Sequence, residues 1–328
     1  MNPTQECSHS QQRALNTIAT AALGLSALVV VLGAYTRLVD AGLGCPDWPG
    51  CYGYLTIPQS ESEIAQSELA FPDAPVEPAK AWTEMVHRYF ASLLGLLILA
   101  LPILAWRTGT RMVLPCVLAV LVVVQGAMGA LTVTLKLWPQ VVTAHLLGGF
   151  ATLALLFHYT LTLRPEIRWR VPAGVSFAIH VTLAALLLQV ALGGWVSSNY
   201  AALACPDFPL CHGVFIPDMD FRNGFNLFQG IGPNYLGGEM SSEARIAIQI
   251  SHRVGALVVL GLSLWVSWML TGAARWTVAG IVTIQFLLGI GNVLLDLPLA
   301  LAVMHNAGAA ALLLALIAGR ASAPEQLP

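Results

Sequence analysis

Four of the eight histidines of this 328-residue chain recur at matched places in its two halves. His145 and His305 are separated by the same spacing as Cys45 and Cys205, which we call the repeat offset. His87 and His252 lie in the related segments EMVHR and QISHR, at a slightly larger spacing. A single histidine in an apolar helix is often only a hydrogen-bonded polar residue, but four at matched positions indicate a shared chemical role. The other histidines do not repeat and are not expected to be ligands: His9, His158, His180 and His212.

The matched histidines predict two haem sites. In each half we expect them on two non-adjacent helices, about one helical turn inside the same face of the molecule. Two facing imidazoles at one level of a four-helix bundle suit axial ligation of haem iron. A tetrahedral zinc site would need two more ligands, and no other cysteine, histidine or carboxylate group repeats at that depth. The predicted pairs are His87 with His145, and His252 with His305.

An arginine directly follows the first histidine of each pair, at Arg88 and Arg253. Because a guanidinium binds planar carboxylates well, both side chains are candidates for contacts to haem propionates at the outer rim. The alternative is an arginine at a helix end that extends its charge towards water. The sequence leaves both interpretations open.

One position breaks the match between the halves. Glu84 precedes His87 by three residues, on the same face of the helix, and its counterpart is Gln249. A carboxyl group beside a haem ligand can take up and release a proton, whereas an amide cannot. We therefore predict that the first half is reactive, with Glu84 catalytic, and that the second half only carries electrons. A favourable helix dipole would also explain Glu84, but it would not explain Gln249.

Four cysteines repeat within GLGCPDWPGCYG and ALACPDFPLCHG. Cys45 and Cys51 form one pair with the spacing C-x5-C, and Cys205 and Cys211 form the other. We predict one local disulfide in each loop, with metal binding as the alternative; the haem-attachment motif C-x-x-C-H is absent. The second disulfide is expected to be structural. Redox chemistry at Cys45–Cys51 is left open.

These residues lie in an unusually apolar chain, which is 57% hydrophobic and only 10% charged, with a mean hydropathy of +0.73. Soluble domains carry about 25% charged residues, so we expect lipid to surround this one. The net charge of −2 gives no indication of nucleic-acid binding. Apolar runs predict eight membrane-spanning helices, at residues 16–36, 85–106, 112–133, 140–163, 172–196, 246–270, 275–295 and 299–319.

The eight spans divide into two sets of four. QGAMGALTV from Gln125 matches QFLLGIGNV from Gln285, again at the repeat offset. Because four is an even number, both sets insert the same way up, as in a parallel repeat. We therefore predict an all-α integral membrane fold of two parallel-repeat four-helix bundles, at residues 1–165 and 166–328.

Charge predicts the orientation. With the N-terminus in the cytoplasm, the inner segments carry a net charge of +5 and the outer segments −7. This agrees with the positive-inside rule, which counts mainly the short loops. Both termini are therefore expected in the cytoplasm and both cysteine loops on the extracytoplasmic side.

Five segments, in order along these spans, resemble the haem A synthase family: TRLVDAGLGCPDWPGCYG, EMVHR, TAHLLGGF, SHR and MHNAGA. The similarity covers about residues 16–319. It implies an oxidoreductase that oxidises the C8 methyl group of haem O to a formyl group through successive hydroxylations. The product, haem A, would serve cytochrome oxidase. The resemblance also implies the plasma (inner) membrane of a bacterium.

The resemblance implies roles for individual residues. His87 and His145 would belong to the substrate haem O site of residues 1–165. His252 and His305 would hold the iron of a haem B cofactor in residues 166–328. Glu84 matches the acidic residue of the family.

Arg37 belongs to the segment TRL, which has no copy in the second half, where VSS stands instead. We therefore expect Arg37 to serve the outer rim of the substrate half alone. The expected partners are haem O, haem O synthase, cytochrome oxidase assembly factors and membrane lipid. A homo-oligomer is compatible with the sequence.

Two alternatives come from other classes of protein. The first is a di-haem membrane cytochrome that transfers electrons to or from quinone and has no chemistry of its own. The difference between Glu84 and Gln249 argues against it. The second is a transporter built from a parallel repeat, which has little support because no helix-breaking segment pairs with a charge at the midplane.

Overall fold

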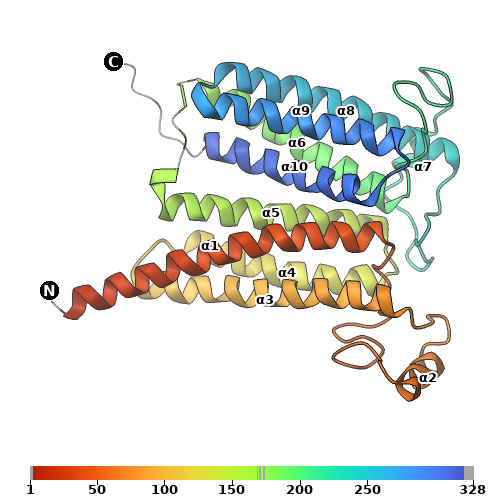
Figure 1. Ribbon diagram of the computed structural model, residues 1–328, viewed down its shortest axis with the longest axis horizontal. Coiled ribbons are helices and arrows are strands. Elements are labelled where there is room, and N and C mark those ends of the chain that lie inside the picture. The colour runs from red at the N-terminus through yellow and green to blue at the C-terminus, as the bar shows by residue number, and fades with distance from the viewer. Residues whose placement is uncertain (1–2, 168, 170, 173, 321–328) are drawn as a thin grey trace.

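The computed structural model describes residues 3–167, 169, 171–172 and 174–320, with backbone only for 3–8 and 167 (Figure 1). Within this part of the chain the structure is helical and has no strand. The eight long helices are α1 (Pro3–Leu38), α3 (Pro78–Thr108), α4 (Val113–Thr134), α5 (Pro139–Leu163), α6 (Val175–Ser198), α8 (Ser242–Met269), α9 (Gly272–Leu294) and α10 (Leu299–Arg320). All eight are long and apolar enough to cross a membrane, which confirms the eight predicted spans. The protein is a multi-pass membrane protein.

Three short elements were not predicted: α2 (Glu61–Ala70), η1 (Pro165–Ile167) and α7 (Phe221–Gly224). Local signals account for the two short α-helices. Ser60 caps α2 and shares a capping box with Glu63, whose carboxylate receives the Ser60 N–H. Asp220 caps α7 by accepting a hydrogen bond from the N–H of Asn223. Hydropathy missed these elements because they are short and polar.

Several long helices begin earlier than their apolar runs; α1, for example, begins at Pro3, where the run predicted residue 16. Helix α3 begins at Pro78, where the apolar run predicted residue 85, and α8 begins at Ser242, where it predicted 246. Proline is favoured at the first helical position, and the Ser241 side chain caps α8 by accepting from Ala244. Hydropathy marks where a helix meets lipid, whereas caps determine where it begins.

The long helices pack mainly with neighbours from the same half of the chain. Helices α3 and α5 each pack against α1 and α4, and α8 and α10 each pack against α6 and α9. In Figure 1 the first four lie together below and the last four lie together above. Helix α5 contacts α6 and α10, and α1 contacts α10, so these helices join the two sets.

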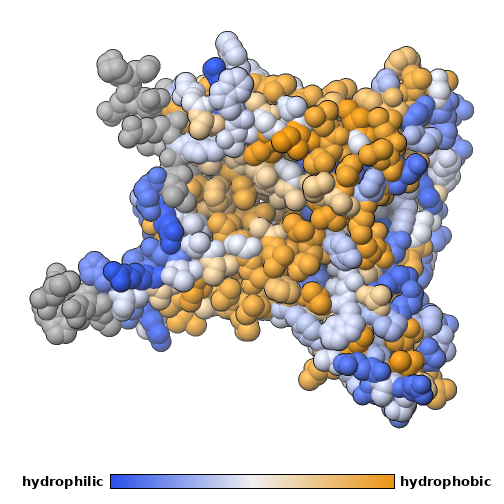
Figure 2. Space-filling view, in the orientation of Figure 1, coloured by the Kyte–Doolittle hydropathy of each residue, from blue (hydrophilic) through white to orange (hydrophobic). Residues whose placement is uncertain are grey.

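The two ends of the molecule are polar, and they differ in the short helices that they carry. Helices α2 and α7 lie at the end opposite the start of α1 and the end of α10 (Figure 1). The side surface between the ends is mostly hydrophobic, and hydrophilic residues gather at both ends (Figure 2). The three most exposed tryptophans lie at the end away from α2: Trp106, Trp268 and Trp276. Such aromatic residues are typical of a membrane–water interface.

The backbone follows the same repeat offset as the sequence. In the described residues, every non-glycine residue with a positive φ has a counterpart at this offset: Asp40 and Tyr200, Tyr52 and His212, Lys136 and Asp296, Leu137 and Leu297. Such values are uncommon outside glycine. The matched loops therefore share a backbone conformation as well as a sequence pattern.

Candidate functional site

Each of the four matched histidines lies with its ring edge against a glycine of a neighbouring helix. The pairs, with the distance from a Cβ built on the glycine to Cε1 of the ring, are Gly33–His87 (3.0 Å), Gly129–His145 (3.6 Å), Gly193–His252 (3.3 Å) and Gly289–His305 (3.1 Å). The glycines themselves are related by the repeat offset. A Cβ at Gly33, Gly193 or Gly289 would crowd the imidazole, whereas one at Gly129 would make ordinary contact with it. We call the four glycines the seats of the rings.

The histidines of each predicted pair lie on two helices that pack against the same two neighbours. His252 on α8 and His305 on α10 come from two helices that both pack against α6 and α9. His87 on α3 and His145 on α5 come from two helices that both pack against α1 and α4. Within the described residues, the buried Nδ1 atoms of these two rings have no hydrogen-bond partner.

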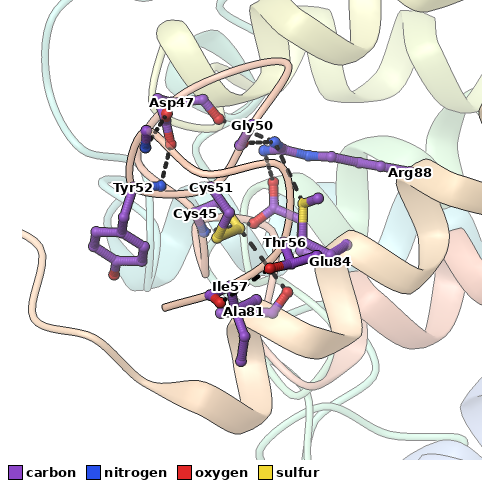
Figure 3. Close-up of a disulfide and its surroundings, with 12 residues drawn as sticks. Cys45, Asp47, Gly50, Cys51, Tyr52, Thr56, Ile57, Ala81, Glu84 and Arg88 are labelled. Carbon is purple, nitrogen blue, oxygen red and sulfur yellow. Dashed lines mark hydrogen bonds and ion pairs between the residues drawn. A yellow bond between two sulfur atoms is a disulfide. The ribbon is translucent and has the colours of Figure 1, made fainter. Parts of the chain in front are cut away.

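Glu84 belongs to α3, and its side chain faces the first cysteine loop (Figure 3). The residue is only 4% exposed. Its Oε2 accepts a hydrogen bond from the backbone N–H of Cys45 at 2.9 Å, and its Oε1 is ion-paired with Arg88. The carboxylate therefore fastens the start of the loop to the helix that carries His87.

Arg88 and Arg253 hold the two cysteine loops in similar ways. Nη1 of Arg88 donates to the carbonyl oxygens of Asp47 at 3.0 Å and Gly50 at 2.5 Å (Figure 3). Arg253 donates to the carbonyls of the second loop: Cys205, Asp207 and Leu210, at 2.8 to 2.9 Å. These guanidiniums are thus engaged with protein, and their contact with propionates remains a prediction.

Both predicted disulfides are present in the structure, with S–S distances of 2.03 Å for Cys45–Cys51 and 2.04 Å for Cys205–Cys211. The aspartate of each C-P-D segment accepts hydrogen bonds from backbone N–H groups just after the second cysteine of its loop. The Asp207 carboxylate accepts the N–H groups of His212 and Gly213, each at 2.8 Å. The Gly213 and His212 hydrogen bonds hold the pKa of Asp207 below its usual range.

Tyr52 links two parts of the first outer loop, because its hydroxyl donates a hydrogen bond to the carbonyl of Pro75 at 3.0 Å. Burial, followed by the nearby Glu77 charge, raises the pKa of Tyr52 to about 12. The phenol therefore keeps its proton, and with it this hydrogen bond, throughout the physiological pH range.

Arg37 connects the two halves. Its Nη2 donates to the carbonyl of Ser197 at 2.6 Å, and its Nη1 donates to the Tyr200 hydroxyl at 3.0 Å and to Asp40 at 3.2 Å. The guanidinium also lies 4.3 Å from the centre of the Tyr200 ring. Arg37 at the end of α1 is therefore held by the end of α6, and its contacts are not confined to the first half.

Comparison with known proteins places the chain in a family. A family model described as cytochrome oxidase assembly protein matches residues 16–317. The haem A synthase of Shewanella oneidensis is 44% identical over 302 residues, which cover 88% of this chain and 91% of that protein. The chain belongs to the haem A synthase family. The haem A synthases of Parvibaculum lavamentivorans and Maricaulis maris are 28% and 27% identical and cover 88% and 95% of this chain, and 88% and 96% of their own.

In this member of the haem A synthase family, the sequence identified the four histidines as candidate ligands. It did not identify the glycines that contact their rings. The glycines stand inside segments already matched between the halves, so the repeat contained that signal. Gln189 gave no such signal, because its equivalent at the repeat offset is Val29. Its contact with His252 depends on the packing of α6 against α8, which the sequence alone does not specify.

Proposed function

We propose that this protein is a haem A synthase, which oxidises the C8 methyl group of haem O to a formyl group. Membership of the family and eight membrane-crossing helices support this function. The observation that carries it is that four histidines share one kind of glycine seat, while only the first half has a carboxylate, Glu84, three residues before its histidine. Two similar sites with one chemical difference suit an enzyme that holds one haem and transforms another.

The residues fit haem in both halves. The seats let the imidazoles pack closely against backbone, and imidazole is a common ligand of haem iron. We propose that His252 and His305 hold the iron of haem B, and that His87 and His145 receive haem O. Bound haem B would supply one-electron transfer.

The proposed arrangement is two parallel-repeat four-helix bundles, one in residues 1–165 with the substrate site and one in residues 166–328 with the cofactor site. The helix contacts and the matched positive-φ residues support it. Residues 1–2, 168, 170, 173 and 321–328 of these two ranges lie outside the described residues.

We assign the proton transfer of the reaction to Glu84. Oxidation of a methyl group to a formyl group releases protons, and a positioned carboxyl group can accept them. Glu84 lies about one helical turn from His87, and the amide of Gln249 cannot replace it. Arg88 keeps the carboxyl group in place through their ion pair. The propionate contacts proposed for Arg37, Arg88 and Arg253 would add to the protein contacts described above.

We propose that the protein lies in the inner membrane of a bacterium with both termini in the cytoplasm. The charge difference between inner and outer segments supports this orientation. The two disulfides support it as well, because disulfides persist outside the cytoplasm. The proposed partners are haem O synthase, which makes the substrate, and assembly factors of cytochrome oxidase; a homo-oligomer is also compatible.

The pigment of the purified protein tests the function. We expect chromatography of the extracted haems to give haem B together with haem O or haem A. Haem B alone, and no conversion of added haem O by the reconstituted protein, would favour the di-haem electron-transfer cytochrome instead.

A further inference from the structure

The amide of Gln189 contacts the ring of His252. Its Nε2 lies 3.0 Å from Nδ1 of the imidazole and donates to the backbone carbonyl of His252 at 2.9 Å. In the first half the equivalent of Gln189 is Val29, and Nδ1 of His87 is buried with no partner in the described part of the chain. The two histidines that begin the predicted pairs therefore differ in their support.

A glycine makes room for this amide. Gly255 follows His252 by three residues, and a Cβ built on it would lie 2.1 Å from Oε1 of Gln189. Alanine at this position would thus displace the amide. When the two helices are aligned through His87 and His252, the first-half equivalent of Gly255 is Phe90. The contact needs both Gln189 and Gly255, and the first half has neither.

The same packing of glutamine on glycine occurs beside the second histidine of each pair. A Cβ on Gly148 would lie 1.8 Å from Nε2 of Gln125, and one on Gly308 would lie 2.1 Å from Oε1 of Gln285. These glycines follow His145 and His305 by three residues. Three of the four histidine helices therefore carry the packing, and the helix of His87 is the exception.

We propose that Gln189 is a positioning residue that fixes the ring of His252 for iron, and that its absence beside His87 leaves the first site able to exchange its haem. The inference rests on the proposed function. The hydrogen bond at one ring nitrogen determines which nitrogen binds metal, so an amide at Nδ1 leaves Nε2 for iron. An imidazole that binds iron through Nε2 carries its proton on Nδ1, so the amide must accept there through Oε1, which has no other partner among the described residues. The amide would turn to do so when iron binds, and it would give up the hydrogen bond from its Nε2 to the His252 carbonyl.

The difference matches what the two sites must do. A cofactor haem stays in its site through many reactions, so a fixed ligand is an advantage. A substrate haem must enter and its product must leave, so a fixed ligand would slow turnover. Valine at position 29 and phenylalanine at position 90 provide no polar group to hold the ring of His87.

The test uses the purified full-length protein and three variants of the contact. In Gln189→Leu and Gly255→Ala, we expect haem B to be held about 10–100-fold more weakly, measured as its transfer to an excess of a haem-scavenging globin. Gln189→Glu keeps an acceptor and should retain haem B. The reduction potential of haem B should be highest in Gln189→Leu, intermediate in the wild type and lowest in Gln189→Glu. A stronger hydrogen-bond acceptor at Nδ1 makes the imidazole a more basic ligand of iron.

Gly261→Ala is the matched control, because Gly261 lies on the same helix and a Cβ there meets nothing within 4 Å. It should keep the wild-type haem content and potential. If Gln189 had only a structural role, the reduction potential of haem B would not follow the order of the residues at position 189. The potentials therefore still decide the test if one variant fails to fold.

Two outcomes separate the inference from the proposed function. If His252→Ala loses haem B while Gln189→Leu and Gly255→Ala keep the wild-type haem-loss rate and potential, the positioning role is wrong and the ligand assignment stands. If His252→Ala keeps the wild-type spectrum, the ligand assignment itself fails, and the positioning role fails with it.

Discussion

The glycine seat of His305 gives a quantitative prediction for Gly289→Ala. The added Cβ would lie 3.1 Å from Cε1 of His305, about 0.4 Å short of ordinary carbon–carbon contact. Overpacking of this size costs about 1–3 kcal/mol, and each 1.4 kcal/mol corresponds to a factor of about ten. We therefore expect haem B to be held about 5–150-fold more weakly.

Gly280→Ala on the same helix provides the comparison, because a Cβ at Gly280 meets nothing within 4 Å. Both changes raise helix propensity by about 1 kcal/mol, so the difference between them isolates the contact with His305. The assay is haem B per protein, with its rate of loss and its absorption spectrum. Equal retention and identical spectra in both variants would refute the idea that the glycine seats position the imidazoles.

The remaining predictions concern the ligands, the proton acceptor, the loops and the junction. His252→Ala should abolish the low-spin bis-imidazole spectrum, and a retained spectrum would exclude this ligand. Glu84→Gln should keep haem B but lower the rate of haem A formation by about 10²–10⁴-fold, with haem O or a hydroxylated intermediate accumulating; wild-type yield would reduce Glu84 to a structural residue. Non-reducing peptide mapping should link Cys45 to Cys51, and free thiols in oxidised membranes would contradict the loop structure. Arg37→Ser removes the hydrogen bonds to the end of α6, so we expect a lower thermal unfolding temperature; no change would show that the junction adds little stability.

The sequence was sufficient where the information is local or repeated. Eight apolar runs located the long helices, because lipid demands about 20 apolar residues per crossing. The repeat singled out the histidines and paired the cysteines within each loop. Helix starts were less accurate, because Pro78 and Ser241 determine them outside the apolar runs.

Contacts between helices could not be predicted in this way. The role of Gln189 depends on how α6 packs against α8, and a glutamine in an apolar helix gives no indication of its partner. Arg37 was expected at the rim of one site because its segment has no second copy. Its actual partners, Ser197 and Tyr200, belong to the other half of the chain and come close only in the folded protein.

The contacts of Arg37 bear on whether the two halves could be identical. Arg37 and Ser197 are equivalent positions, as are Asp40 and Tyr200, and the four meet at the boundary between the halves. In a dimer of identical halves, each of these positions would carry the same residue twice, and two guanidiniums would face each other across the symmetry axis at a cost in repulsion. The difference between the equivalent positions lets one half keep the arginine while the other supplies the carbonyl and the ring that hold it. The contact therefore requires two different halves, and two identical copies of either one could not form it.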